Sequence, residues 1–185
     1  MTRQRLIAAA MEVVAERGFD EARSEEIVRR AGLTNGALYA HFKNKNELLL
    51  AAFAEQTSYL QEVISEVDAT GLDEVEKLIR LVRSHPVMPV RESIVGETLA
   101  RARRDGGIRE IWLRQLATIE ETYARWIRTG QAKGIVRPEI EPHVAARLIS
   151  SLGTGYQVLW EISAPPIEEQ DWIASLCGVV ESFRR

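Results

Sequence analysis

Apolar side chains recur at every third or fourth position along most of the chain, and this spacing strongly limits the folds that are open to it. Residues 2–18 and 44–71 each place their apolar positions on one stripe, as the 3.6-residue period of the α-helix requires. No segment shows the convincing alternation of apolar and polar residues that a half-buried strand needs. The sequence therefore predicts an all-α protein with about nine helices.

Glycines, prolines and capping residues predict where these helices begin and end. Gly18 is expected to stop the first helix, and Ser24 to cap a second, short one. Asn44, followed three residues later by Glu47, resembles a capping box at the start of a long helix. Asp73 is expected to cap the helix after it. Further helices are expected over about residues 94–102, 108–127, 144–161 and 168–185.

Composition and charge exclude several classes of protein. The 185 residues are 45% hydrophobic and 28% charged, which is ordinary for a globular protein and argues against long disordered stretches. The single cysteine, Cys177, excludes an intramolecular disulfide, and no apolar run approaches the roughly 20 residues that span a bilayer. We therefore expect a cytoplasmic protein without a membrane partner. The net charge of −3 argues against a general nucleic-acid coat, but the nearly neutral residues 1–48 permit a polyanion-binding surface.

The stretch TNGALYAHFKNK, residues 34–45, carries more polar and aromatic side chains than packing alone requires. Asn-Gly between apolar runs usually signals a tight hairpin turn, yet the segments on both sides are helical. We interpret Thr34 as the cap of a short third helix, with Asn35 and Gly36 in its first turn. Leu38 and Phe42 then face inward because they stand four residues apart. The side chains left on the outside are those of Asn35, Tyr39, His41 and Lys43.

The second and third helices are joined by the turn AGLT, in which Gly32 takes a conformation that a side chain would resist. Two helices joined by a short glycine-containing turn are the signature of a helix-turn-helix. On these residues the chain resembles the N-terminal DNA-binding domain of the TetR family of transcriptional regulators. The resemblance runs from about residue 2 to 53, through the GF after the first helix, AGLT, GALYAHF and the K-x-ELL that opens the fourth helix. The remainder resembles the family only in its pattern of helices.

The resemblance implies a helix-turn-helix DNA-binding domain over residues 1–46 and an effector-binding and dimerisation domain over residues 47–185. The third helix would enter the major groove of double-stranded DNA. The residues at the DNA would be Ser24, Thr34, Asn35, Gly36, Ala37, Tyr39, His41 and Lys45. Asparagine suits bidentate contact with adenine, and tyrosine, histidine and lysine suit phosphate oxygens. Arg3 and Arg5 would form a short arm toward the minor groove.

Two apolar sets in the remainder are candidates for a ligand pocket and a dimer interface, and core packing is the competing explanation for both. The candidate pocket residues are Met88, Arg91, Val95, Leu99, Trp112, Leu116, Ile119, Tyr123 and Trp160. Residues of the last two helices would build a four-helix bundle across a two-fold axis. They are Leu152, Gly153, Gly155, Tyr156, Leu159, Trp172, Ile173, Leu176, Val180 and Phe183. The expected effector is a small apolar or aromatic organic molecule.

Enzymatic functions find no support in the sequence. The three histidines stand far apart without metal-ligand spacing, and neither a P-loop nor a nucleophile elbow is present. We expect no catalytic residues, no metal and no cofactor. The leading hypothesis is a ligand-responsive transcriptional regulator, a repressor that binds a palindromic operator as a homodimer and is released by its effector. The alternative is a helical small-molecule-binding or protein-interaction module that does not bind DNA, which the acidic Glu25 favours.

Overall fold

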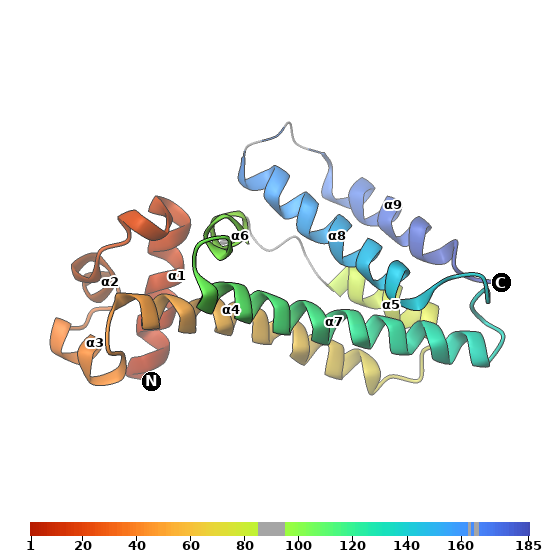
Figure 1. Cartoon of the computed structure of the whole chain (residues 1–185), viewed down its shortest axis with the longest axis horizontal. Coiled ribbons are helices and arrows are strands. Elements are labelled where there is room, and N and C mark those ends of the chain that lie inside the picture. The colour runs from red at the N-terminus through yellow and green to blue at the C-terminus, as the bar shows by residue number, and fades with distance from the viewer. Residues whose placement is uncertain (85–94, 163, 165–166) are drawn as a thin grey trace. The chain divides into compact units, whose positions relative to one another are not determined.

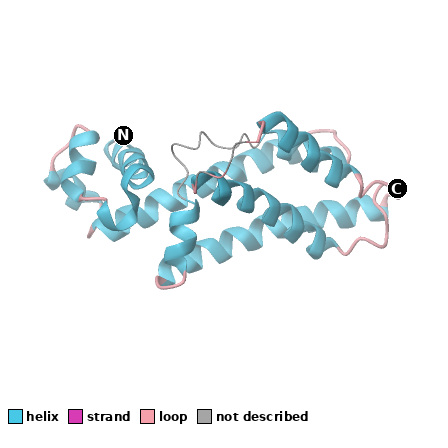
Figure 2. Cartoon of the chain, turned by 90° about the horizontal axis from the view of Figure 1, so that it is seen from above, coloured by secondary structure: helices cyan, strands magenta, loops and turns pink. Residues whose placement is uncertain are grey.

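The computed structural model describes residues 1–84, 95–162, 164 and 167–185, without the side chains of residues 53, 56–60, 84 and 97. The described residues form nine helices joined by loops (Figure 1, Figure 2). The helices are α1 Thr2–Glu21, α2 Ser24–Arg30, α3 Asn35–His41, α4 Lys45–Asp68, α5 Glu74–Ser84, α6 Val95–Ala102, α7 Gly106–Ala132, α8 Pro142–Glu161 and α9 Glu169–Glu181. These ranges contain no strand, and an isolated antiparallel bridge joins Val136 to Arg184. The predicted all-α fold is therefore confirmed.

The chain divides into two compact units. The N-terminal unit consists of the described residues of Met1–Tyr59 and Pro89–Trp112, and the C-terminal unit of those of Leu60–Met88 and Leu113–Arg185. Helices α4 and α7 each contribute residues to both units. The domain boundary at residue 46 stays a prediction.

The core of the N-terminal unit is built from the apolar faces of α1 to α4. Its fully buried members include Leu6, Ala10, Val13, Ile27, Leu38, Leu48 and Leu49. Gly18 adopts a φ of 79°, so α1 kinks there and continues to Glu21 rather than stopping as predicted. The kink lets Phe19 enter the core, because the chain changes direction directly before it. Positive φ costs glycine little, which explains the residue at this position.

The starts of α2 and α4 differ in how closely they follow the prediction. Ser24 is the first helical residue, and Arg23 takes the capping position without a side-chain cap, so the prediction for Ser24 was wrong by one residue. The cap of α4 is confirmed, because the Asn44 Oδ1 accepts from the Glu47 N–H at 2.9 Å. The Glu47 carboxylate in turn accepts from the Lys43 N–H at 2.6 Å, one residue earlier than in a standard capping box.

The C-terminal unit packs α5, α7, α8 and α9 around a second core. Buried side chains from these helices include Val75, Leu78, Trp126, Ile127, Ala146, Ile149 and Val180. The predicted cap at Asp73 is confirmed, since its Oδ1 accepts from the N–H groups of Val75 and Glu76 at 3.0 and 2.9 Å. Helix α8 begins at Pro142, where a missing N–H costs nothing, and the Glu141 carboxylate caps it.

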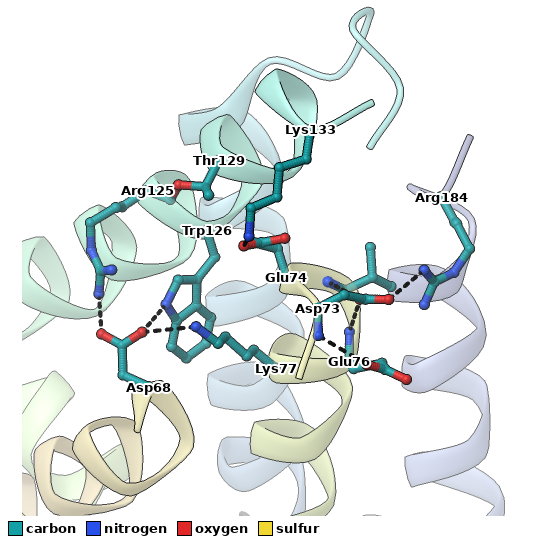
Figure 3. A network of polar contacts seen from close by, with 11 residues as sticks. Asp68, Asp73, Glu74, Glu76, Lys77, Arg125, Trp126, Thr129, Lys133 and Arg184 are labelled. Carbon is teal, nitrogen blue, oxygen red and sulfur yellow. Dashed lines mark hydrogen bonds and ion pairs between the residues drawn. The ribbon is translucent and has the colours of Figure 1, made fainter. Parts of the chain in front are cut away.

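A polar network borders this second core (Figure 3). The Asp68 carboxylate accepts hydrogen bonds from Arg125 at 2.7 Å, from the indole of the buried Trp126 at 2.9 Å and from Lys77 at 3.3 Å. These bonds, with that from Arg125 the largest cause, lower the pKa of Asp68 to about 2. Buried Glu74 accepts from Lys133 at 2.6 Å, which gives its charge a partner.

We predict that Asp68→Asn destabilises the protein at pH 7 by on the order of 1 kcal/mol. We discount the full effect of the pKa shift because 33% of the Asp68 side chain is exposed. The folded pKa lies below the unfolded value near 3.9, so the contribution is complete above that value and is lost as pH falls toward 2. Urea unfolding at pH 7, 4 and 3 measures the difference from the parent, which should shrink at pH 3.

The exposed carboxylate of Glu139 offers a matched control for this experiment. Glu139→Gln should change the free energy of unfolding by less than about 0.5 kcal/mol at each pH. An Asp68→Asn effect that is equally large at pH 7 and pH 3 would contradict the assignment.

Candidate nucleic-acid interface

The turn between α2 and α3 has the geometry of a Schellman motif. Gly32 has a φ of 63°, its N–H donates to the Arg29 carbonyl at 3.1 Å, and the Leu33 N–H donates to the Val28 carbonyl at 2.8 Å. A Cβ added at Gly32 would lie 2.9 Å from a terminal nitrogen of Arg5. Both the φ and this close approach therefore favour glycine, as the sequence predicted.

The cap and the two faces of α3 also follow the prediction. Thr34 has extended backbone angles, and its Oγ1 accepts from the Ala37 N–H at 3.4 Å. Leu38 is fully buried and Phe42 is 3% exposed, so these two side chains anchor the short helix in the core. In contrast, 59% of Tyr39 is exposed. Asn35, Gly36 and His41 are exposed as well, and Ala37 is half-buried.

Lys45 lies at the first position of α4, where its side chain is half-buried. Its Nζ donates to the carbonyl oxygens of Phe19 and Asp20, both at 3.4 Å. The ammonium group of this predicted phosphate ligand is therefore held against the end of α1. Ser24, another predicted DNA contact, is half-buried at the start of α2.

Arg3 and Arg5 do not form the predicted extended arm. Helix α1 already begins at Thr2, so Arg3 and Arg5 lie within its first turns rather than in an extended segment. The Arg5 guanidinium donates to the Ala31 carbonyl at 2.6 Å, and that of Arg3 lies 5.4 Å from the centre of the Phe42 ring. Both side chains therefore contact the helix-turn-helix itself, and the expectation for them was wrong.

The acidic residues at the start of α2 differ in their surroundings. Glu26 is paired with Arg17 at 3.0 Å and lies 3.7 Å from Arg30, so neighbouring cations offset its charge. Glu25 is exposed in the same turn. Arg29, one turn further along α2, has an exposed side chain and adds positive charge to this surface.

The predicted pocket residues belong to both units. Met88 and Arg91 lie outside the described residues. Val95, Leu99 and Trp112 are in the N-terminal unit, where the Trp112 indole donates to the buried Thr98 hydroxyl at 3.2 Å. The C-terminal unit contains Leu116, Ile119, Tyr123 and Trp160. Ile119 and Tyr123 belong to its buried core, and the assignment of the whole set to a pocket stays a prediction.

The predicted interface residues are partly buried within one chain. Val180 and Phe183 belong to the core of the C-terminal unit, so the alternative of intramolecular packing holds for these two. Tyr156 and Trp172 stack at a ring separation of 4.7 Å and join α8 to α9. Tyr156, Leu176 and the half-buried Trp172 and Ile173 are thus largely covered by the chain itself. Gly153 and Gly155 have open space where a Cβ would stand.

An apolar stripe on the outside of α8 was only partly anticipated. It consists of Val144, Leu148, Leu152, Gly155, Leu159 and Ile162, which are three or four residues apart and therefore share one face. Val144 and Ile162 are 67% and 69% exposed, and Leu148 and Leu159 are 45% and 54% exposed. On the neighbouring α9, the small residues Ala174 and Gly178 are exposed. We call these residues together the α8–α9 face; its spacing was visible in the sequence, but its exposure was not.

The exposed α3, anchored behind a tight glycine turn, defines the N-terminal unit as a helix-turn-helix. Residues 6–52 match the family described as bacterial regulatory proteins, tetR family. The A-factor receptor protein of Streptomyces griseus is 29% identical over 174 residues, which make up 92% of this chain and 59% of that protein. The HTH-type transcriptional regulator UidR of Escherichia coli is 28% identical over 172 residues, 91% of this chain and 85% of that protein.

A solved structure of a transcriptional regulator from Saccharomonospora viridis, in complex with choline, has the same fold. It superimposes with a TM-score of 0.86 at 23% identity and covers 98% of this chain and 96% of that chain. Residues 6–52 therefore carry the N-terminal DNA-binding domain of the TetR family of bacterial regulatory proteins. The matched relatives are regulators of transcription rather than enzymes.

None of the described helices combines the length and the apolar character needed to cross a bilayer. Across the same residues, no three His, Cys, Asp or Glu side chains gather in a way that would hold a metal ion.

We predict that Gly32→Ala destabilises the protein by about 1–2 kcal/mol, because alanine resists the left-handed conformation and its Cβ would crowd Arg5. Thermal or urea unfolding measures the change. Gly71→Ala is the control, since no atom lies within 4 Å of the position of the added Cβ and the φ there is not positive. Equal stability of the two variants would show that the turn does not require glycine.

Proposed function

We propose that the protein is a homodimeric repressor that binds a palindromic DNA operator and is released by a small organic effector. The observation that carries the proposal is α3, a seven-residue helix whose inner face is anchored and whose outer face exposes Asn35, Tyr39 and His41. The match of residues 6–52 to a regulator family supports it. Such a repressor acts where the bacterial chromosome lies, in the cytoplasm.

Each exposed group suits a particular contact with DNA. The Asn35 amide can pair with the N6 and N7 atoms of adenine in the major groove, and the small Ala37 can meet a thymine methyl group. Thr34 and Gly36 stand at the same end of α3, and the missing Cβ of Gly36 allows the backbone to approach DNA closely. Tyr39, His41, Ser24 and Lys45 are suited to phosphate oxygens. Lys45 would have to exchange its two backbone carbonyls for a phosphate.

We predict that Tyr39→Ala weakens binding to the DNA flanking the gene of this protein at least tenfold, because a phosphate contact is lost. Asn35→Ala should cost about 1–3 kcal/mol and reduce discrimination between operator sequences. Fluorescence anisotropy at several salt concentrations and a footprint measure both effects, and parental affinity should fall steeply with salt.

Arg137→Ala, which removes an exposed cation from the C-terminal unit, is the control and should bind like the parent. If Tyr39→Ala and Lys45→Ala both bind like the parent, the docking is wrong. If the parent itself binds no DNA in a palindromic footprint, the alternative of a module that does not bind DNA is favoured.

The α8–α9 face supports a homodimer. A contiguous apolar stripe exposed on a monomer marks an interaction site, and the occupant we propose is a second copy of this chain. Two copies of α8 and α9 related by a two-fold axis would form a four-helix bundle. Leu148 and Leu159 would fill the space left by Gly155 and Gly178 of α8 and α9, where an added Cβ meets no atom within 4 Å. A two-fold axis would also pair the α3 helices for a palindrome.

We predict that Leu148→Asp combined with Leu159→Asp converts the dimer to a monomer, because two carboxylates would be buried in an apolar interface. Light scattering after size exclusion measures the mass, and circular dichroism verifies that the helices are retained. The control is Leu113→Asp on α7, where the side chain is 59% exposed outside this face. A dimer that survives the double substitution would exclude the interface.

The effector would act by binding more tightly to the conformation that does not fit the operator. Met88, Arg91, Val95, Leu99, Trp112, Leu116, Ile119, Tyr123 and Trp160 remain the proposed pocket, whose composition suits an apolar or aromatic molecule. The S. viridis regulator of the same fold was solved with choline, which supports a small organic ligand. Because α4 contributes to both units, it is the proposed lever between effector and DNA.

A further inference from the structure

A pocket of about 720 Å³ lies at the corner where α6 leads into α7, within the N-terminal unit. Its lining residues are Asp20, Ala100, Arg101, Arg103, Arg104 and Asp105. The volume is in the range that holds a small molecule. None of the residues proposed above for DNA, effector or dimer contacts lines it, so the pocket has no role in the proposed function.

The charges around this pocket leave a positive excess. The Asp105 carboxylate caps α7 and accepts from the N–H groups of Gly107 and Ile108 at 2.9 and 3.2 Å. Arg103 and Arg104 are exposed, and within the described chain neither lies within ion-pair distance of a carboxylate. Two adjacent guanidinium groups therefore face solvent without an ion-pair partner among the described residues.

Arg101 adds a third guanidinium group in a fixed position. It lies over the Phe19 ring at 4.6 Å and donates to the Asp20 carboxylate. Its Nε is buried and has no hydrogen-bond partner among the residues that the structure describes. The side chain of Asp20 is 86% exposed, so water competes for it and the ion pair is easily exchanged.

We propose that this pocket binds a small phosphate-bearing anion, which takes the place of Asp20 on Arg101 and bridges to Arg103 and Arg104. Planar guanidinium groups present paired donors that match phosphate oxygens, and several of them together favour a multiply charged anion over chloride. A free small molecule fits the observations better than the DNA backbone, because the arginines line a pocket rather than the outer face of α3.

The site is connected to the DNA-binding machinery through the end of α1. The carbonyls of Phe19 and Asp20 accept from Lys45, while the side chains of the same two residues contact Arg101. An anion that displaces Asp20 from Arg101 would change the anchoring of this segment and with it the position of Lys45. This consequence rests on the proposed DNA-binding function, whereas binding of the anion does not.

Calorimetric titration with inorganic pyrophosphate at constant ionic strength tests the site. The parent should bind one pyrophosphate per chain, and Arg103→Gln combined with Arg104→Gln should weaken binding at least tenfold. Arg80→Gln combined with Arg137→Gln removes the same charge from exposed positions of the C-terminal unit and should change affinity less than twofold. Asp20→Asn should tighten binding severalfold, because Arg101 no longer has an anionic partner. Thermal unfolding establishes that each variant is folded.

Three outcomes would overturn the proposal. If the Arg103 and Arg104 double variant binds pyrophosphate with parental affinity, or if the control loses as much affinity, the parent binds an adventitious ion only. If the Asp20→Asn variant binds pyrophosphate no more tightly than the parent, the anion does not take the place of Asp20 on Arg101. If the double variant instead loses DNA affinity and salt dependence without pyrophosphate, the arginines serve DNA phosphates. Absence of any DNA binding by the parent would refute the proposed function while leaving the calorimetric result intact.

Discussion

Burial of Leu38 and Phe42 beneath α3 is the interaction on which the candidate interface depends. A helix of seven residues is too short to be stable alone in water, because nucleation costs more than so few hydrogen bonds return. The two side chains, with Ile27 and Leu48 of neighbouring helices, supply the apolar contact that keeps α3 folded. The glycine turn at Gly32 sets the direction in which the helix leaves α2. The buried apolar contact and the glycine turn are both needed to hold Asn35 and Tyr39 outward.

Polar groups at the ends of helices complete this arrangement, and they also connect it to the rest of its unit. Thr34 and Asn44 each accept from an N–H group in the first turn of the helix that they cap. The end of α1 has a different role, since its backbone carbonyls hold Lys45 and its Asp20 side chain holds Arg101. The lysine proposed to contact DNA and the arginine-lined pocket thereby share one short segment of backbone.

Local patterns predicted much of the fold and the exposed face of α3. The spacing of Leu38 and Phe42 indicated their burial, and Thr34 and Gly32 indicated the limits of the helices. The same reasoning failed for Arg3 and Arg5, which contact Phe42 and Ala31. Such partners are distant in the sequence, and no local periodicity indicates them.

On the α8–α9 face, too, local patterns predicted one part of the structure and missed another. Helical spacing showed that Leu159 and Val180 are apolar positions of their helices, but it could not show which of them the chain covers. By itself, the sequence determined the presence of the helices, the caps Thr34, Asn44 and Asp73, the glycine turn and the likeness of residues 6–52 to a regulator family, because these depend on neighbours within a few residues. The tertiary structure alone decided the burial of Val180, the exposure of Leu159, the carbonyl partners of Lys45 and the gathering of arginines beside Asp20, because each depends on packing between segments that are far apart along the chain.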